Sequence, residues 1–492
     1  MARHLLRRTG FGAVPEDVAA LTGVRADQAV DQILAEVYSR ASYRRPGWVT
    51  VRPPHEFASE AAFEAFFELN DAWMNEFIRE LMAEWINGSI RQRLTLFWHD
   101  HFATSYEKYE LSTFAVRYLE VLRQGALGSF QSMVRNVTQD PAMLLYLDGY
   151  INDRYAPNEN YARELLELFT TGRTAPDGTA NYTENDITEI ARALSGWTVN
   201  FTTLAADFYP TLFDNDPKNV FGRTGNYNAI GVIDLIFDVK GDVIARHLAS
   251  KLFREFVHNE PDEEMQAALG HEFKTRNFTI SELLRVILKS QYFFDSEGAV
   301  GARVKSPVEL LVGMAKEFGM APSGSLFEAV YWEAAAAGQQ VFFPPNVAGW
   351  PSQTDWLSTS TLPSRWNSSG WFTYFGGVPS DEALREWANA LSPPDDALQA
   401  FRLPKSMLEH LMPVPLRDLN LPRTHGGFGG DLAQFPVPDT IRSEMTPQEI
   451  ALAADMLGGT PWYEWDISNP AALGLIRFYL ASVFRRPEYQ LI

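Results

Sequence analysis

The sequence contains no cysteine, which excludes disulfide bonds, thiolate metal sites and a cysteine nucleophile. It also lacks any run of about 18 apolar residues, the length that a membrane-spanning helix needs. Basic residues are few: 42 Lys and Arg stand against 62 Asp and Glu, for a formal net charge of −20. Sequence-independent nucleic-acid binding requires clustered positive charge. We therefore expect neither a membrane span nor a nucleic-acid partner.

The signatures of several common enzyme classes are missing as well. There is no GxxxxGK[ST] phosphate loop, no HExxH zinc motif and no GxSxG nucleophile elbow. The acidic stretch 214–226 lacks the central glycine and the closing glutamate of a calcium-binding loop. Nucleotide hydrolysis, zincin chemistry and serine-hydrolase chemistry have no support in the sequence.

What is present is the composition of a folded protein, with 46% hydrophobic and 21% charged residues. Helical periodicity dominates the first two-thirds of the chain, and strand-like alternation is scarce. We predict a mainly α fold: a large multi-helix domain with long irregular loops and at most a small β-hairpin excursion. The expected helices cover 56–82, 88–102, 112–124, 158–171, 183–196, 242–257, 261–269, 280–292, 305–318, 324–337, 446–457 and 470–484.

The distribution of proline, glycine and aromatic residues suggests three parts of one domain. Residues 1–340 form a helical core, interrupted by an irregular excursion at about 198–230. Residues 341–440 form a Pro/Gly/aromatic-rich loop region packed on that core, and residues 441–492 add the C-terminal helices.

The most informative segment is NENYARELLELFTTG at 158–172, in which Asn158 can cap a helix and Gly172 can end it. Its polar residues Asn160, Arg163, Glu164 and Glu167 share one helical face, and the other faces are largely apolar. Such a helix is expected to be buried, with the polar stripe facing an internal cleft or internal partners. Two interpretations stay open. The glutamates are metal ligands or an acid–base pair, or Arg163 pairs with both of them as a structural brace.

The segment FWHDHF places His99 and His101 on either side of Asp100. On a helix, residues i and i+2 point about 200° apart, so both imidazoles can face one metal only where the chain is extended or unwinds. Neutral imidazole is a common ligand of zinc, copper and iron. Carboxylates of the 158–171 helix or His247 would have to complete the site. The alternative is one histidine in the core and one at the surface.

Two further segments carry candidate residues. In NYTENDITEIARALSGW (181–197), Thr183 and Asp186 resemble a capping box, which leaves Glu184, Arg192 and Trp197 available for a site or for salt bridges. In PPNVAGWP (344–351), Gly349 permits a close backbone approach and Trp350 offers a flat stacking surface. This rigid loop can wall a binding groove or plug one end of the core.

Several of these strings together resemble the DUF1800 family of bacterial proteins: HLLRRTGFGAVPEDV, FWHDHFATS, DPAMLLYLDG, PNENYARELLELFTTG, NYTENDITEIARALSGW, FPPNVAGWP with DWL, and RRPEYQ. The resemblance covers nearly the whole chain, with the strings in the same order. It implies no established activity. It does imply a DUF1501-type partner, from a family similar to alkaline phosphatases and sulfatases, and an exported or periplasmic setting, although the first residues lack the apolar stretch of a signal peptide. It also suggests that the polar stripe, the histidine pair and the GWP loop meet.

We therefore predict metal-assisted chemistry, hydrolytic or oxidative, on a polymeric or cell-envelope substrate. His99 and His101 would bind a divalent or transition metal, and Glu164, Glu167, Arg163 and Glu184 would form the catalytic set. Asn160, Arg192, Trp197, Asn346 and Trp350 would contact the substrate. The alternative is a non-catalytic binding or accessory protein, for a carbohydrate or a DUF1501-type partner, in which the polar stripe is an internal salt-bridge brace.

Overall fold

The structure is a computed structural model that describes residues 1–54, 58–258, 261–295, 298–318, 324–370, 373, 379–394, 398–416, 419, 437 and 439–492. Helices dominate it, as predicted. In the first half they are α1 (Ala2–Thr9), α2 (Pro15–Leu21), α3 (Ala26–Leu34), α4 (Glu60–Asn87), α5 (Ile90–His101), α6 (Tyr106–Tyr109), α7 (Ser112–Gly125), α8 (Phe130–Thr138), α9 (Pro141–Tyr146), α10 (Asn160–Glu164), the π-helix η3 (Leu165–Thr170) and α11 (Glu184–Ala193).

The second half adds α12 (Ala229–Phe256), α13 (Glu263–Thr275), α14 (Ile280–Lys289), α15 (Pro307–Glu317), α16 (Gly324–Ala336), α17 (Thr361–Gly370), α18 (Asp381–Leu391), α19 (Gln399–Leu411), α20 (Asp439–Glu444), α21 (Pro447–Leu457) and α22 (Pro470–Phe484). Several of these helices begin at side-chain caps that the sequence contains. Thr183 and Asp186 form the predicted capping box of α11, and Ser306 with Glu309 forms another on α15.

The predicted excursion contains two small antiparallel hairpins. Strands β1 (Trp197–Asn200) and β2 (Ala205–Phe208) pair with Trp197 opposite Phe208, and β3 (Lys218–Val220) pairs with β4 (Arg223–Gly225). The β3 strand lies against α11. The described β structure is thus confined to short ribbons beside a helical body.

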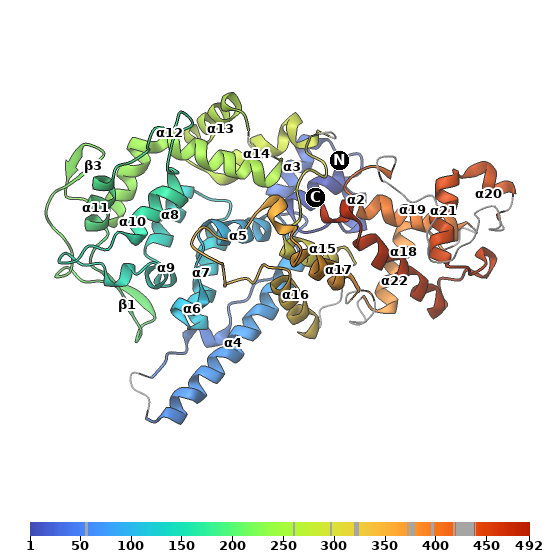
Figure 1. Ribbon diagram of the computed structural model, residues 1–492, viewed down its shortest axis with the longest axis horizontal. Helices are drawn as coiled ribbons and strands as arrows, with labels where there is room; N and C mark the ends of the chain where they lie inside the picture. Colours follow the sequence, from blue (N-terminus) through green and yellow to red (C-terminus); the bar gives the residue numbers. More distant parts are fainter. Residues whose placement is uncertain are drawn as a thin grey trace.

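The helices are arranged around a central group that contains α5 and α15 (Figure 1). On one side, the long helix α12 packs against α8, α13 and α14; on the other side, α18, α19, α21 and α22 pack on one another. The first half of α4 projects from the body. A continuous hydrophobic core contains residues from Leu5 near the N-terminus to Tyr489 near the C-terminus, and both chain ends lie near the middle of the molecule.

Two sequence expectations differ from the structure. The 341–440 stretch, predicted as a loop region, contains α17, α18 and α19 among its described residues. Helix α12 begins at Ala229, well before the predicted start at 242, although Gly231, Gly241 and several β-branched residues lower the intrinsic helix propensity there. Burial of its apolar residues against α8 and α13 outweighs that propensity.

Candidate functional site

The predicted polar stripe on α10 and η3 lies at the surface instead of facing an internal cleft. Arg163 donates to Glu184, with 2.8 Å between Nη2 and Oε2, and lies 3.3 Å from Glu159. The side chains of Arg163 and Glu184 are 35% and 77% exposed. The apolar side of this segment is buried and its polar side faces solvent, as in an ordinary amphipathic helix. Arg163 therefore forms a surface ion-pair brace, with partners outside the predicted glutamate pair.

The remaining stripe residues have equally local partners. Asn160 donates to Asp148 over 3.3 Å, and Glu167 accepts a hydrogen bond from the Tyr182 hydroxyl at 3.0 Å. Burial, and then the charge of neighbouring Glu167, raises the pKa of Glu164. Arg192 is held between Glu189 and Asp214, at 2.8 and 2.7 Å.

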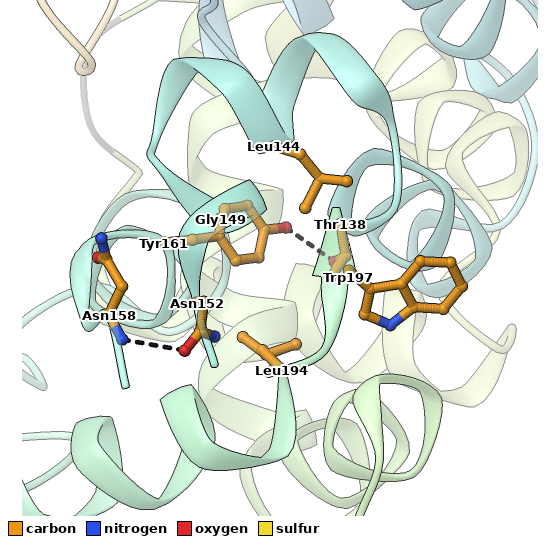
Figure 2. A pocket seen from close by; sticks show the side chains of 8 residues that line it. All are labelled: Thr138, Leu144, Gly149, Asn152, Asn158, Tyr161, Leu194 and Trp197. Atoms are coloured by element: carbon orange, nitrogen blue, oxygen red, sulfur yellow. Dashed lines mark hydrogen bonds between the residues drawn. The ribbon is translucent and has the colours of Figure 1, made fainter. Parts of the chain in front are cut away.

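Trp197 lines a small cavity that offers no room for a substrate. Figure 2 shows its lining, which consists of Thr138, Leu144, Gly149, Asn152, Asn158, Tyr161, Leu194 and Trp197. The Tyr161 hydroxyl lies 2.8 Å from Thr138 Oγ1, and the backbone N–H of Asn158 donates to Asn152 Oδ1 over 2.9 Å. With a volume of about 10 Å³, the cavity has space for about one water molecule.

The two histidines of α5 diverge, as expected for residues i and i+2 of a helix. His99 Nε2 accepts a hydrogen bond from the Phe342 amide at 3.1 Å, and its ring packs against Trp350. His101 Nε2 lies 3.1 Å from the Phe169 carbonyl oxygen, to which it donates. In the part of the chain that the structure describes, no three His, Asp or Glu side chains are grouped to hold a metal ion. The predicted metal site at His99 and His101 therefore has no support in the geometry.

The residue between the histidines contacts the GWP loop. Asp100 Oδ1 accepts a hydrogen bond from the Trp350 amide at 2.7 Å. Gly349, with φ +86°, passes so close that a Cβ there would lie 2.3 Å from Asp100 Oδ1. Glycine is required at this position because a side chain has no space and the backbone is left-handed. Trp350 is buried against His99, whereas Asn346 is exposed at the tip of the loop.

On another side, His101 and α12 meet the C-terminal end of η3. Lys251 Nζ lies 3.2 Å from His101 Nδ1 and 3.3 Å from the Leu168 carbonyl oxygen. His247, one turn before Lys251, lies near the Leu168 carbonyl, which raises the pKa of its imidazole against the larger effect of burial. The last carbonyls of a helix lack partners within it and carry partial negative charge, which favours cationic and N–H donor side chains. Gly172 ends this segment at φ +70° and leaves space for His247, whose Nδ1 would be 3.0 Å from a Cβ.

These contacts bring His101, His247 and Lys251 together, and Asp100 is close enough to interact electrostatically with Lys251. We call these four residues the α5–α12 cluster. Asp100, His247 and Lys251 are intermediate in exposure, and His101 is buried. Burial raises the pKa of Asp100 to about 7 and lowers that of Lys251 to about 8. Burial also lowers the pKa of His247 to about 3, so this imidazole is neutral at pH 7.

A buried ion-pair network lies behind the cluster. Arg93 contacts Glu255 and lies 2.5 Å from Glu309, which Arg303 contacts at 3.1 Å. Burial alone would raise the pKa of Glu309, but Arg303 and Arg93 lower it to about 2. Glu255 adds to the upward shift of the Asp100 pKa. The network thus holds α5, α12 and α15 together, and its charged residues Glu255 and Arg93 act on the carboxyl group of Asp100.

The structure places the α5 histidines beside the GWP loop and the end of η3, whereas the polar stripe of α10 faces solvent. Lys251 and Asp100 were not among the candidates predicted from the sequence. A usable signal was present: His247 and Lys251 are four residues apart in ARHLASKLF, which places both on one face of a largely buried helix.

Comparisons with known proteins agree with the resemblance of the sequence motifs. The family model described as "Protein of unknown function (DUF1800)" matches residues 4–491. No curated protein and no solved structure matches the chain. Among the described residues, no helix is long and apolar enough to cross a membrane. The match covers almost the entire length, and the chain belongs to the DUF1800 family.

Proposed function

We propose that this chain is an enzyme that catalyses proton-transfer chemistry at the α5–α12 cluster, most simply the hydrolysis of a polymeric or cell-envelope substrate. The observation that carries the proposal is the convergence of three distant segments on partly exposed Asp100 and Lys251. Both have pKa values displaced towards neutrality, to about 7 and about 8. General acid–base catalysis is most efficient when the pKa lies near the working pH.

The roles follow from the protonation states. Lys251, whose neutral fraction is appreciable near pH 8, would act as the general base that takes a proton from water. Asp100, whose carboxyl group is still partly protonated near pH 7, would act as the general acid for the leaving group. His101 orients Lys251 through the 3.2 Å contact, because its other nitrogen is fixed by the Phe169 carbonyl. Perturbed pairs of this kind are typical of active sites.

The first test measures Lys251 without requiring a substrate. Acylation of individual lysines at a series of pH values, followed by mass spectrometry, should give a midpoint near pH 8 for Lys251. Asp100→Asn should lower that midpoint, because the Asp100 charge raises the pKa of Lys251. The exposed Lys274, paired with Asp242, is the internal reference. A Lys251 midpoint near the ordinary value of 10.5 would refute the proposed base.

The second test separates a catalytic from a structural lysine. Lys251→Met leaves His101 Nδ1 and the Leu168 carbonyl without their donor, so we expect it to lower the free energy of unfolding by about 1 to 3 kcal/mol and the protein to stay folded. Activity on a panel of chromogenic esters, glycosides and phosphate esters should fall by about 10²- to 10⁴-fold. Lys274→Met is the matched control. A folded Lys251→Met protein that keeps full activity would contradict the proposal.

A second candidate function, that of an accessory protein, is favoured by the projecting half of α4 (Figure 1). Phe63 and Leu69 are 46% and 47% exposed there, and the intervening residues Glu64 and Glu68 are exposed as well. An exposed apolar surface bordered by acidic residues fits a partner surface that is apolar and basic. We expect Phe63→Ser with Leu69→Ser to weaken binding of a purified DUF1501-type protein, whereas Val37→Ser, also at an exposed site, should not. Equal binding by both variants would remove this candidate.

A further inference from the structure

A second cavity, unrelated to the α5–α12 cluster, lies where the N-terminal helices meet the C-terminal helical group. Its volume is about 420 Å³, within the range of small-molecule sites. Helices α2 and α18 pack against each other at this place (Figure 1). The ends of α4 and α15 complete the walls, which include Val14, Ile86, Lys316, Phe318 and Trp387. Binding sites occur preferentially at junctions of this kind.

The apolar part of the cavity is built by aromatic and branched side chains. Phe318 and Trp387 pack with their ring centroids 4.7 Å apart, and both are almost fully buried. Ile86 and Val14 extend this apolar surface from α4 and from the chain before α2. An occupant must therefore present an apolar body, and the two rings favour an aromatic one.

The charged part of the cavity is dominated by Lys316. Its side chain is buried, and its ammonium group donates to the Gly88 carbonyl, which uses one of three N–H donors. The nearby carboxylates have other partners: Glu317 binds Arg7 at 2.7 Å, and Asp17 binds Arg40 at 2.5 Å. Among the residues that the structure describes, Lys316 has no carboxylate in ion-pair contact. Burial without such a partner lowers its pKa to about 8.

The remaining charged residues of the lining decide which anions fit. Arg40 is occupied by Asp17, to which it donates two hydrogen bonds. Glu16 and Glu386 are exposed at the rim, where solvent screens them from the interior. Two rim carboxylates and the buried Glu317 disfavour anions with more than one charge. A single carboxylate can pair with Lys316 at the smallest electrostatic cost.

We propose that this cavity binds a small monocarboxylate with an aromatic body, whose carboxylate pairs with Lys316 and whose ring packs against Phe318 and Trp387. The site does not depend on the proposed enzymatic function, since it shares no residue with the α5–α12 cluster.

Isothermal titration calorimetry with 3-phenylpropionate tests this proposal. The acid should bind the full-length protein, and the neutral 3-phenylpropionamide should bind at least about tenfold more weakly, because its uncharged amide oxygen accepts from the Lys316 ammonium without forming an ion pair. Acetate, which lacks the ring, and inorganic phosphate, which carries more charge, should not bind measurably. Equal affinity for acid and amide, or no binding of the acid at millimolar concentration, would overturn the proposal.

Variants assign the binding to this cavity. Lys316→Met should weaken binding of the acid by roughly 10- to 150-fold and binding of the amide by a smaller factor. Trp387→Leu should weaken the binding of the acid and of the amide by similar factors. Lys289→Met, at a lysine that pairs with Asp31 on the surface of α14, is the control and should change neither. Thermal unfolding of each variant establishes that it is folded. Unchanged acid binding by folded Lys316→Met would place the ligand elsewhere and refute the assignment.

Discussion

At the scale of single residues, Gly349 is the position where the backbone itself determines the site. Alanine there would adopt an unfavourable left-handed conformation and would place Cβ 2.3 Å from Asp100 Oδ1. We expect Gly349→Ala to lower the free energy of unfolding by at least about 2 kcal/mol, the sum of backbone strain and a displaced Asp100.

The matched control for this change is Gly178→Ala. Gly178 has nearly the same φ, +83°, but nothing lies within 4 Å of its Cβ position. Gly178→Ala should lower the free energy of unfolding only by the cost of the left-handed backbone, about 1 kcal/mol. Urea unfolding of both variants measures the difference, and equal costs would show that Gly349 does not need to approach Asp100 closely.

The raised pKa of Asp100 leads us to expect a pH dependence of the free energy of unfolding. Its pKa is about 7 in the folded chain, above the ordinary 3.8, so the folded state binds this proton more tightly than the unfolded state. The resulting stability is complete below about pH 4 and is lost as the pH rises through about 7. Asp100→Asn removes this dependence and still offers an oxygen to the Trp350 amide. The stability of the wild type relative to Asp100→Asn should therefore fall between about pH 5 and about pH 8 in urea unfolding. A constant difference over that range would contradict the raised pKa.

At the scale of elements, the last carbonyl groups of η3 are the hydrogen-bond acceptors for His101 and Lys251. Asn181 donates its side-chain amide to the carbonyls of both Thr171 and Gly172, at 3.0 Å each. Asn181→Ala leaves these buried acceptors without their donor and should cost about 1 to 3 kcal/mol. It should also make the end of η3, including the Leu168 carbonyl, more mobile and let water reach Lys251. A more hydrated amine has a higher pKa, so the acylation midpoint of Lys251 should rise.

The exposed neighbour Thr179 supplies the comparison for that variant. Among the described residues its hydroxyl bonds only to Asp177, in the same turn, so Thr179→Ala should change the free energy of unfolding by less than about 0.5 kcal/mol. If Asn181→Ala lowered the free energy of unfolding as little as Thr179→Ala, the side-chain amide of Asn181 would not stabilise the end of η3.

The same element shows how far the sequence could lead. Caps and breakers are local signals, so the capping box at Thr183 and the end at Gly172 could be predicted. The π-helical turn at Leu165–Thr170 could not, because the wider turn is stabilised by contacts from Lys251 and His101, about 70 to 90 residues away in the chain. Likewise, the spacing of Arg163 and Glu164 predicted a shared face. Whether that face pointed inward depended on which neighbours pack against η3.

At the scale of the whole molecule, the N-terminal helix connects parts of the chain that are hundreds of residues apart. Arg7 of α1 donates to Glu317 at the end of α15, at 2.7 Å, and to the carbonyls of His410 and Met412 at the end of α19. Arg8 donates to the carbonyls of Val257 and Ala299. These bonds join the central helices to both flanking groups, so the motif HLLRRTG serves the assembly of the fold.

Arg7→Met tests that connection. The variant leaves the buried Glu317 carboxylate without its ion-pair partner and removes the donor from two carbonyls, so we expect a loss of about 3 to 5 kcal/mol in the free energy of unfolding. The double variant Arg7→Met with Glu317→Leu should recover a substantial part of that loss, since no unpaired charge then stays buried. Arg25→Met is the control, because its pair with Asp27 is exposed and should contribute less than about 1 kcal/mol. Urea unfolding of the wild type, both single variants, the double variant and the control measures these differences. Strict additivity of Arg7→Met and Glu317→Leu would mean that Arg7 stabilises the fold through the carbonyls of α19 alone.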